Sequence, residues 1–294
     1  MNTVNPPVLS LGQTMAELQA RGLDRLDAQL LLLHLLGKSA NQRGWLMAHD
    51  DEPLPPALAS TLELLVLRRL SGEPLAYLTG RKEFFGLDLQ VDDRVLVPRP
   101  DTEALVNWAL ELLDGQQRVL DMGTGSGAIA LALKASKPTL HVHASDFSAD
   151  ALAVARSNAR RLKLDVSSSQ GAWFAALSAS EAPFDCIVSN PPYIAERDPH
   201  LSALEFEPSL ALTSGSDGLD DLRRIISQAP KHLVPGGWLL LEHGYDQAQA
   251  VRNLLTASGF VQVQSRHDLA GIERCSGGQF NPSTQQPPHH DQPD

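Results

Sequence analysis

The stretch Gln117-Arg118-Val119-Leu120-Asp121-Met122-Gly123-Thr124-Gly125-Ser126-Gly127 decides the fold of this chain. Its first half has the short apolar pattern of a buried strand, and its second half is a glycine-rich loop. The Ala- and Leu-rich residues 128–135 that follow favour a helix. A strand, a glycine loop and a helix in this order bring free backbone N–H groups at a helix start close to a ligand. The stretch therefore predicts the opening unit of an α/β ligand-binding domain.

A second predicted strand, residues 140–146, ends in Asp146, about twenty residues after the glycine loop. A carboxylate at this spacing accepts hydrogen bonds from the ribose hydroxyls of a nucleoside cofactor. The loop alone leaves the cofactor open: Gly123, Gly125 and Gly127 suit S-adenosylmethionine, but the first two with Ala128 also fit the dinucleotide form. A glycine-rich turn that binds nothing is the third interpretation.

The tetrapeptide Asn190-Pro191-Pro192-Tyr193 follows another apolar run, at residues 184–189. Open α/β sheets bind ligands at the carboxyl ends of their strands, and the two prolines stiffen the turn there. We interpret the turn as a clamp for a planar NH2 group. The Asn190 side-chain oxygen and the Pro191 carbonyl accept its two N–H bonds, while Tyr193 packs on its face. Methyl transfer to nitrogen uses such a clamp and hydride transfer does not, so the turn favours S-adenosylmethionine.

The loop, the acid and the tetrapeptide resemble those of the amino-methyltransferases, and two further blocks narrow the resemblance. They are Gly72-Glu73-Pro74-Leu75-Ala76-Tyr77 and Pro98-Arg99-Pro100-Asp101-Thr102-Glu103. With them, residues 10–280 are similar to the peptide chain release factor glutamine methyltransferases, the HemK/PrmC family. The resemblance implies S-adenosylmethionine-dependent N5-methylation of the glutamine in the Gly-Gly-Gln motif of class I release factors.

The resemblance also implies roles for individual residues. Cofactor binding falls to Gly123, Thr124, Gly125, Ser126, Gly127, Asp146, Trp173 and Asn190. Substrate binding falls to Asn190, Pro191, Pro192, Tyr193 and Arg99, and catalysis to Asn190, Pro191 and Tyr193. Plain core packing is the alternative for Trp173, and bracing of the domain junction is the alternative for Arg99. Ala172 departs from the family pattern, because relatives commonly carry there an acid able to hold the adenine amino group.

Four segments are predicted along the chain. Residues 1–80 have a helical leucine pattern and form a small bundle, which the resemblance implies recognises the protein substrate. Residues 81–100 alternate as a β-hairpin does and join the bundle to the second domain. In residues 101–280 strands alternate with helices, which predicts an α/β, Rossmann-like methyltransferase domain with a parallel sheet. The Pro-, Gln- and His-rich residues 281–294 are predicted to be disordered.

The composition excludes several classes of protein. A net charge of −11 over 294 residues argues against nucleic-acid binding, because phosphate contacts require a basic face. Cys186 and Cys275, the two cysteines, give neither a disulfide framework nor metal-ligand spacing, so we expect no metal. No apolar run is long enough to cross a membrane, and no signal-peptide pattern opens the chain. We expect a cytoplasmic monomer that contacts neither nucleic acid nor membrane.

Other functions stay open at this point. One is methylation of a glutamine in a ribosomal protein, and another is N6-methylation of adenine in nucleic acid, which shares the Asn-Pro-Pro-Tyr motif. A binding module without catalysis and a nicotinamide-dependent oxidoreductase are the remaining alternatives. The chain also carries its own Gly277-Gly278-Gln279, which raises self-methylation of Gln279 as a hypothesis.

Overall fold

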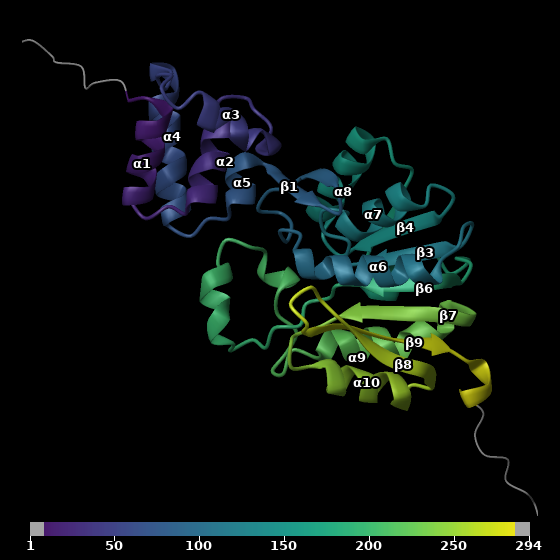
Figure 1. The fold of residues 1–294 in the computed structure, drawn as a ribbon. Helices are drawn as coiled ribbons and strands as arrows, with labels where there is room; N and C mark the ends of the chain where they lie inside the picture. The colour runs from purple at the N-terminus through teal and green to yellow at the C-terminus, as the bar shows by residue number, and fades with distance from the viewer. Residues whose placement is uncertain (1–8, 286–294) are drawn as a thin grey trace, which may run out of the picture. The chain divides into compact units, whose positions relative to one another are not determined.

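The computed structural model describes residues 9–285 of the chain, which divides into two compact units, Met1–Arg81 and Lys82–Asp294. Figure 1 shows a helical first unit and a second unit built on a sheet. No helix among the described residues has the length and apolar character needed to cross a bilayer. Within the same residues, no group of three or more His, Cys, Asp or Glu side chains is placed to hold a metal ion.

The first unit is the predicted helical bundle. Its helices are α1 (Leu11–Ala20), α2 (Arg25–Leu35), α3 (Arg43–Ala48), α4 (Pro56–Leu70) and α5 (Leu75–Thr79), with a 3-10 helix, η1 (Ala40–Gln42). Helix α1 starts at Ser10 because a capping box joins that residue to Gln13. The apolar face of α2 is fully buried at Leu31 and Leu32, where it packs against Val66 of α4. On the outside, the Lys38 ammonium lies 4.1 Å from the Trp45 ring centroid.

A short hairpin opens the second unit. Strands β1 (Arg81–Phe84) and β2 (Leu87–Gln90) are joined by Phe85 and Gly86, both with positive φ, as a tight two-residue hairpin turn requires. The alternating pattern over 82–97 predicts longer strands than these, and residues 91–99 have no regular structure. Asn158 anchors the hairpin, since it accepts a hydrogen bond from Gln90 N (2.7 Å) and donates one to Gln90 O (2.9 Å).

The sheet has seven strands in the order β5-β4-β3-β6-β7-β9-β8. They are β3 (Arg118–Met122), β4 (His141–Asp146), β5 (Ser167–Gln170), β6 (Phe184–Ser189), β7 (Leu233–Glu242), β8 (Phe260–His267) and β9 (Glu273–Phe280). Strands β3 to β7 pair in parallel, and β9 is antiparallel to both of its neighbours. This mostly parallel sheet confirms the predicted α/β fold.

Helices cover both faces of the sheet. They are α6 (Glu103–Leu112), α7 (Ala128–Ser136), α8 (Ala149–Leu162), α9 (Asp220–Gln228) and α10 (Ala248–Ala257). Leu120 and Met122 of β3 belong to the core cluster that also contains residues of α9 and α10. The intervening Asp121 faces the other way, toward α7, and α6 packs beside α7 in Figure 1. Short 3-10 helices complete the unit: η2 (Pro100–Thr102), η3 (Trp173–Ala176), η4 (Pro199–Leu204), η5 (Ser209–Ala211), η6 (Ala229–Lys231) and η7 (Pro282–Gln285).

The sequence pattern predicts strands at 118–122, 140–145, 184–189, 238–242 and 260–264, which correspond to β3, β4, β6, β7 and β8. It does not predict β5 or β9. Strand β5 is Ser-Ser-Ser-Gln at the sheet edge, so it carries no apolar alternation. Strand β9 contains Gly277 and Gly278, which are rare in strands; a Cβ at Gly277 would lie 2.6 Å from Leu239 O. The Gln279 amide donates to Gly236 O and accepts from Gln262, both at 2.9 Å. Gly277–Gln279 is therefore part of a paired strand rather than an exposed loop.

The order of the strands creates a single switch point. From β3 the chain builds outward through β4 and β5, then returns to the other side of β3 with β6 and β7. The crevice that suits a ligand in such a sheet lies at the carboxyl ends of the two strands where the direction reverses, here β3 and β6. The parallel register places Met122 beside Ser189, and the Ser189 hydroxyl donates to Met122 O at 2.7 Å. The glycine loop and the Asn190 turn therefore start side by side.

Of the predicted C-terminal tail, residues 281–285 are described and include η7, whereas residues 286–294 lie outside the described part of the chain.

Candidate active site

The buried side chain of Asp121, on β3, stabilises the glycine loop that follows this strand. The Asp121 Oδ2 atom accepts from Thr124 Oγ1 at 2.6 Å and from Ala130 N at 3.0 Å, so the carboxylate ties the loop to the first turn of α7. Complete burial raises the pKa of Asp121 to about 7, against the lowering effect of these two hydrogen bonds. The side chain of Thr124 is therefore a support of the loop.

The loop itself depends on glycine. Gly123, Gly125 and Gly127 have φ values of 70°, 54° and 86°, which side-chain-bearing residues rarely adopt. A Cβ at Gly127 would also lie 3.0 Å from the Leu131 side chain. Ser126 is buried, and its carbonyl accepts from Asn158 at 2.9 Å. The predicted cofactor loop thus exposes bare backbone at its first two glycines and is packed tightly at its last two residues.

Asp146, at the end of β4, links the second strand to this loop. Its Oδ2 accepts from Gly125 N at 2.9 Å and its Oδ1 accepts from Ser148 N at 2.8 Å. Burial raises the pKa of Asp146 above its ordinary value, and these backbone N–H groups partly offset the shift. A carboxylate oxygen has a second lone pair, so each oxygen keeps capacity for a ribose hydroxyl.

The loop, Asp146 and Asn190 border one cavity of about 380 Å³. Its wall consists of residues 94–96, 123, 125, 145–148, 151, 171–173, 190, 192, 208, 210, 211, 213, 221 and 224. The structure thus brings six of the predicted site residues to the cavity: Gly123, Gly125, Asp146, Trp173, Asn190 and Pro192. The other six lie outside its wall: Thr124, Ser126, Gly127, Pro191, Tyr193 and Arg99.

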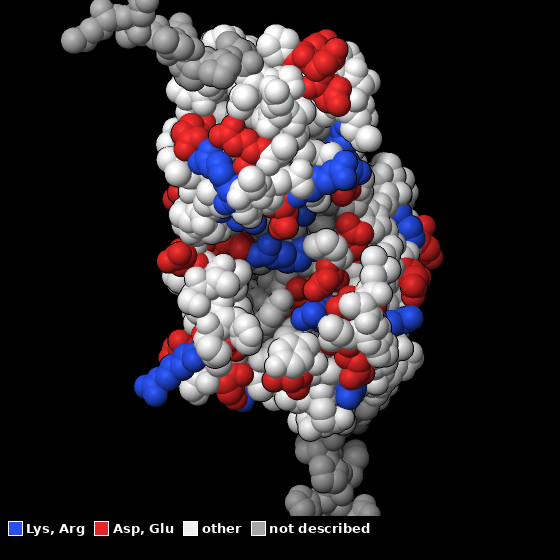
Figure 2. All heavy atoms as spheres, turned by 60° about the vertical axis from the view of Figure 1, so that its left-hand side comes forward, with Lys and Arg blue, Asp and Glu red and all other residues white. Residues whose placement is uncertain are grey.

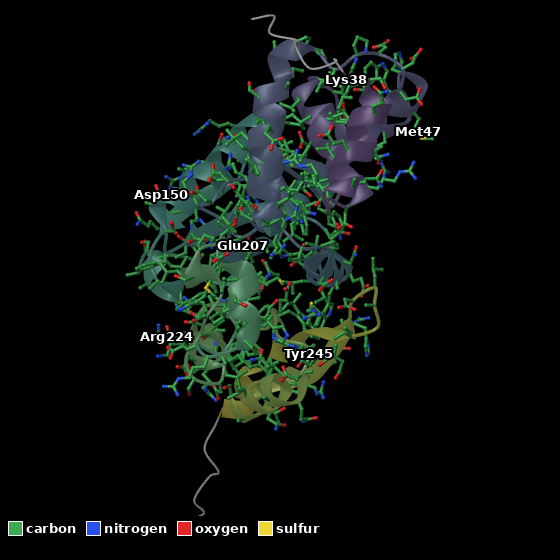
Figure 3. The ribbon with its side chains drawn as sticks, turned by 90° about the vertical axis from the view of Figure 1, so that its left-hand side faces the viewer. Lys38, Met47, Asp150, Glu207, Arg224 and Tyr245 are labelled. Atoms are coloured by element: carbon green, nitrogen blue, oxygen red, sulfur yellow. The ribbon has the colours of Figure 1, made fainter. Side chains whose placement is uncertain are left out.

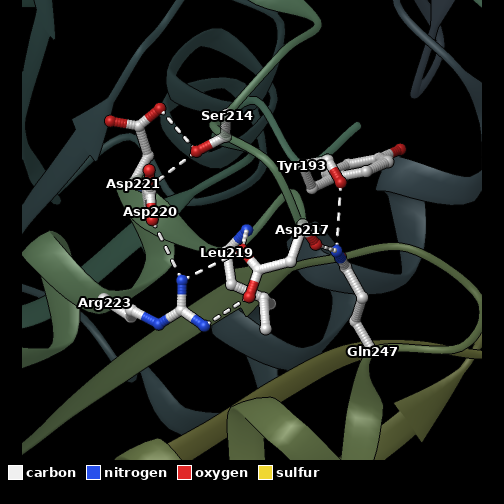
Figure 4. Close-up of polar contacts among 8 residues, drawn as sticks. All are labelled: Tyr193, Ser214, Asp217, Leu219, Asp220, Asp221, Arg223 and Gln247. Carbon is white, nitrogen blue, oxygen red and sulfur yellow. Dashed lines mark hydrogen bonds and ion pairs between the residues drawn. The ribbon is translucent and has the colours of Figure 1, made fainter. Parts of the chain in front are cut away.

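Trp173 forms the wall above Gly123. A Cβ built on Gly123 would lie 3.7 Å from the Trp173 ring, so the indole lies against the glycine loop. Trp173 itself has φ of 51°, an uncommon value for a bulky residue. Its Nε1 donates to Asp221 Oδ1 at 3.0 Å, and Asp221 Oδ2 accepts from the Ser214 hydroxyl at 2.8 Å. The Asp221–Ser214 pair appears in Figure 4, and it connects the start of α9 to the segment that follows η5.

Asn190 borders the cavity, whereas the Tyr193 hydroxyl is directed to the buried Glu242. Asn190 Nδ2 donates to Thr102 Oγ1 at 3.3 Å, which leaves its Oδ1 available as an acceptor. The Tyr193 hydroxyl donates to Glu242 Oε1 at 3.3 Å, and burial raises the pKa of this phenol. Gln247 donates to the Tyr193 carbonyl at 3.0 Å, a contact that Figure 4 shows. The turn is therefore held at both ends by residues distant in the sequence.

Arg99 is paired with a buried acid. It forms an ion pair with Glu207, whose side chain is 2 % exposed, while that of Arg99 is 40 % exposed. Glu207 Oε2 also accepts from Val97 N at 3.0 Å. The Pro98–Asp101 turn is thus tied to the loop before η5, whose Pro208 lines the cavity. This pairing gives Arg99 a bracing role beside the substrate role implied by the family resemblance.

Most of the other wall residues are not predicted from the sequence, and four of them have prominent side chains: Phe147, Leu210, Asp221 and Arg224. Phe147 follows Asp146 directly and is 64 % exposed, so an aromatic residue next to the strand-end acid was the available signal. Leu210 is 73 % exposed, and no sequence signal separates it from an ordinary surface leucine. Asp221 and Arg224 lie one turn apart on α9, which otherwise has the pattern of a surface helix; Arg224 is labelled in Figure 3.

The surface charge agrees with the acidic composition. In Figure 2, basic side chains on the visible face lie among acidic ones. Arg94 at the cavity is one example, because it forms a 2.6 Å ion pair with Asp92. Such pairing lowers the capacity of these arginines to hold nucleic-acid phosphates.

Comparison with known proteins supplies a family context for this geometry. Residues 101–206 match the family model described as methyltransferase small domain, and residues 11–80 match the PrmC N-terminal domain. The release factor glutamine methyltransferase of Bordetella pertussis is 52 % identical over 261 residues, which cover 87 % of this chain and 95 % of that protein. The Burkholderia pseudomallei protein of the same name is 49 % identical over 291 residues, or 95 % and 99 % of the two chains. A methyltransferase crystal structure from Pyrococcus furiosus shares the fold, with a TM-score of 0.53 and 20 % identity over 73 % of this chain and 97 % of that chain.

Proposed function

The chain belongs to the family of release factor glutamine methyltransferases, and on this premise we propose that it methylates the N5 atom of a glutamine in a peptide chain release factor. The methyl donor in the proposal is S-adenosylmethionine, and the substrate glutamine is that of the Gly-Gly-Gln motif. The observation that carries the proposal is that Asn190 and the glycine loop border the same cavity at the switch point of the sheet.

The chemistry of the cavity wall suits S-adenosylmethionine. Gly123 and Gly125 present backbone without side chains, and Asp146 keeps acceptor capacity for two ribose hydroxyls. Phe147 and Trp173 offer aromatic surfaces for a purine. Ala172 in the wall has no acidic group for the adenine amino group, so these surfaces carry more of the adenine recognition. When bound, the cofactor supplies an electrophilic methyl group on a sulfonium.

The protein's contribution to the reaction is orientation and electrostatics. The nitrogen of a glutamine amide is a poor nucleophile, because its lone pair is delocalised into the carbonyl group. Asn190 Oδ1 accepts one of its N–H bonds at the cavity, and the carbonyl of Pro191, the next residue of the same turn although outside the cavity wall, accepts the other. Alignment of this kind contributes up to about 7–11 kcal/mol in the best intramolecular models. Both acceptors also stabilise the positive charge that grows on the nitrogen. Tyr193, held by Glu242, fixes the end of the turn.

Recognition of the protein substrate is assigned to the first unit. Residues 11–80 match the PrmC N-terminal domain, and the second unit has the methyltransferase match. In this proposal the second unit binds the cofactor and the target side chain, and the first unit binds other parts of the release factor.

A substrate panel tests the proposal. The purified protein is incubated with methyl-labelled S-adenosylmethionine and, separately, with a release factor, total ribosomal protein and DNA. We expect label on the release factor, located by mass spectrometry on the Gly-Gly-Gln peptide, and no label on a release factor whose glutamine is replaced by alanine. Label on a ribosomal protein or on DNA in place of the release factor would overturn the proposal.

A further inference from the structure

The side-chain amide of Gln247 connects three separate segments of the second unit. Gln247 is the residue before helix α10, and its Oε1 accepts from Gly244 N, just after β7, at 2.8 Å. Its Nε2 donates to the Tyr193 carbonyl at 3.0 Å and to the Asp217 carbonyl at 3.4 Å, and Figure 4 shows both contacts. One amide therefore joins the end of the Asn190–Tyr193 turn to the end of β7 and to the segment before α9.

The surroundings of this side chain suit an amide and do not suit a carboxylate. The Gln247 oxygen faces an N–H donor and its nitrogen faces two carbonyl oxygens, so these neighbours determine which way the amide points. A glutamate in this place would keep the bond from Gly244 N. It would lose both bonds that Nε2 donates, and its charge would lie against two carbonyl oxygens. The contact with Tyr193 therefore depends on the NH2 group.

Gly218 lies against the same carbonyl of Tyr193. It is buried and has a φ of 75°, and a Cβ there would overlap the Tyr193 carbonyl oxygen and lie 2.8 Å from Gln247 Nε2. The preceding residue, Asp217, is held by a 2.5 Å ion pair with Arg223 of α9. The Tyr193 carbonyl is thus packed between the backbone at Gly218 and the amide of Gln247.

The two ends of the turn are fixed by different parts of the fold. Before its start, Ser189 is paired with Met122 and with Leu241 in the neighbouring strands. At its end, the Tyr193 carbonyl is held by Gln247. Between these ends the rings of the two prolines fix φ, so a displacement at one end is transmitted along the turn rather than absorbed within it.

We propose that Gln247 is a positioning residue for methyl transfer. By holding the Tyr193 carbonyl, it keeps the Pro191 carbonyl and the Asn190 side-chain oxygen aligned with the substrate nitrogen. This inference rests on the proposed function. Gln247 itself is outside the cavity wall, so it acts through the turn and touches neither cofactor nor substrate.

Two variants and one control test the inference in the full-length enzyme with a release factor as substrate. Gln247→Met keeps the length of the side chain without its donor and acceptor, and Gln247→Glu keeps the acceptor for Gly244 N alone. Gln249→Met is the control, because Gln249 is exposed and its amide contacts only Asn253 and Arg252 of the same helix. The readouts are the single-turnover rate, KM for the release factor, affinity for S-adenosylhomocysteine by calorimetry, and the melting temperature. The rates are measured at a temperature at which each variant is folded.

We expect both Gln247 variants to lower the rate about tenfold, the equivalent of one lost hydrogen bond, with KM and cofactor affinity within about threefold of the wild type. Gln249→Met should keep the wild-type rate. A Gln247→Glu enzyme with the wild-type rate would overturn the inference, because the bond from Gly244 N would then suffice. A loss of rate matched by an equal loss of cofactor affinity would also overturn it and assign Gln247 to general stability. A wild-type enzyme that leaves release factors unmodified would instead contradict the proposed function.

Discussion

Trp173 and Asp221, 48 residues apart in the sequence, are joined by a 3.0 Å hydrogen bond from the indole Nε1 to the carboxylate Oδ1, and both line the cavity. The second oxygen of Asp221 accepts from Ser214, and the backbone N–H of Asp221 donates back to the Ser214 hydroxyl, both at 2.8 Å. One carboxylate thus connects the wall over the glycine loop to the segment after η5. The wall of the cavity is therefore built jointly by distant parts of the second unit.

Replacement of Trp173 by phenylalanine tests this connection. The variant keeps an aromatic ring against Gly123 but removes the N–H donor, which leaves Asp221 Oδ1 without its partner. A hydrogen bond of this kind contributes about 1 kcal/mol, so we expect affinity for S-adenosylhomocysteine to fall about five- to tenfold, measured by calorimetry. Trp45→Phe in the first unit is the matched control, and it should bind as the wild type does. Equal affinity of all three proteins would show that the indole N–H has no part in the wall.

Asn190→Ala separates cofactor binding from turnover. Asn190 is one of the residues that line the cavity, and the glycine loop, Asp146, Phe147 and Trp173 line other parts of it. We expect calorimetric affinity for the cofactor product within a few-fold of the wild type and a loss of turnover of about 10²–10³-fold, as for removal of one donor or acceptor from a preorganised site. Turnover that survives this substitution would remove Asn190 from the mechanism.

Substitutions of Arg99 and Glu207 distinguish two roles for Arg99, which are stabilisation of the Pro98–Asp101 turn and binding of the substrate. Arg99→Ala leaves the Glu207 carboxylate, 2 % exposed, with Val97 N as its remaining partner. Because Arg99 is itself partly exposed, we expect a loss in the free energy of unfolding of about 1–3 kcal/mol in urea. The double variant Arg99→Ala/Glu207→Gln should recover part of this loss, since the uncompensated charge is gone.

The Michaelis constant for the release factor supplies the second measurement on the same variants. If Arg99 also contacts the substrate, KM should rise in the single and the double variant alike, although only the single variant is strongly destabilised. A KM that returns to the wild-type value together with stability would assign Arg99 to bracing alone.

Glu242 should leave a signature in the pH dependence of stability. Its pKa in the folded protein is about 7, above the ordinary value of 4.5, because burial disfavours the charged form. Between these values the folded state keeps a proton that the unfolded chain has released, so this group's contribution to stability falls as the pH rises from about 4.5 to about 7 and is level above that. Asp121 shifts in the same direction, so the wild type alone does not isolate Glu242.

A comparison of the wild type with the Glu242→Gln variant isolates the contribution of Glu242 to the pH dependence of stability. The difference in unfolding free energy between variant and wild type should move in favour of the variant by up to about 3 kcal/mol between pH 4.5 and 7.5. Urea denaturation at the two pH values measures this difference. A difference that stays constant with pH would mean that Glu242 titrates at its ordinary value in the folded protein.

Much of the α/β framework was readable from local sequence. Strands β3 and β6 are short, mostly apolar runs that end before Gly123 and Asn190, and β4 ends at the acid Asp146; each is observed where its pattern predicts it. The switch point could be inferred once the glycine loop and Asn190-Pro191-Pro192-Tyr193 were placed at strand ends. Strand β5, which is polar, and β9, which contains two adjacent glycines, were missed because their pairing depends on neighbouring strands rather than on their own residues.

The sequence by itself determined which backbone conformations were available: positive φ at the glycines of the loop, a stiff turn at Pro191 and Pro192, and helices where leucine recurs. These are properties of single residues and their immediate neighbours, and they need no tertiary contact. The tertiary structure decided which polar groups lose their water and meet. Glu242 behind Asn190, Asp221 beside Trp173 and Glu207 beneath Arg99 are ordinary acids in the sequence. Their pairing follows from burial among segments far apart in the chain, and burial is the physical cause that directs their hydrogen bonds.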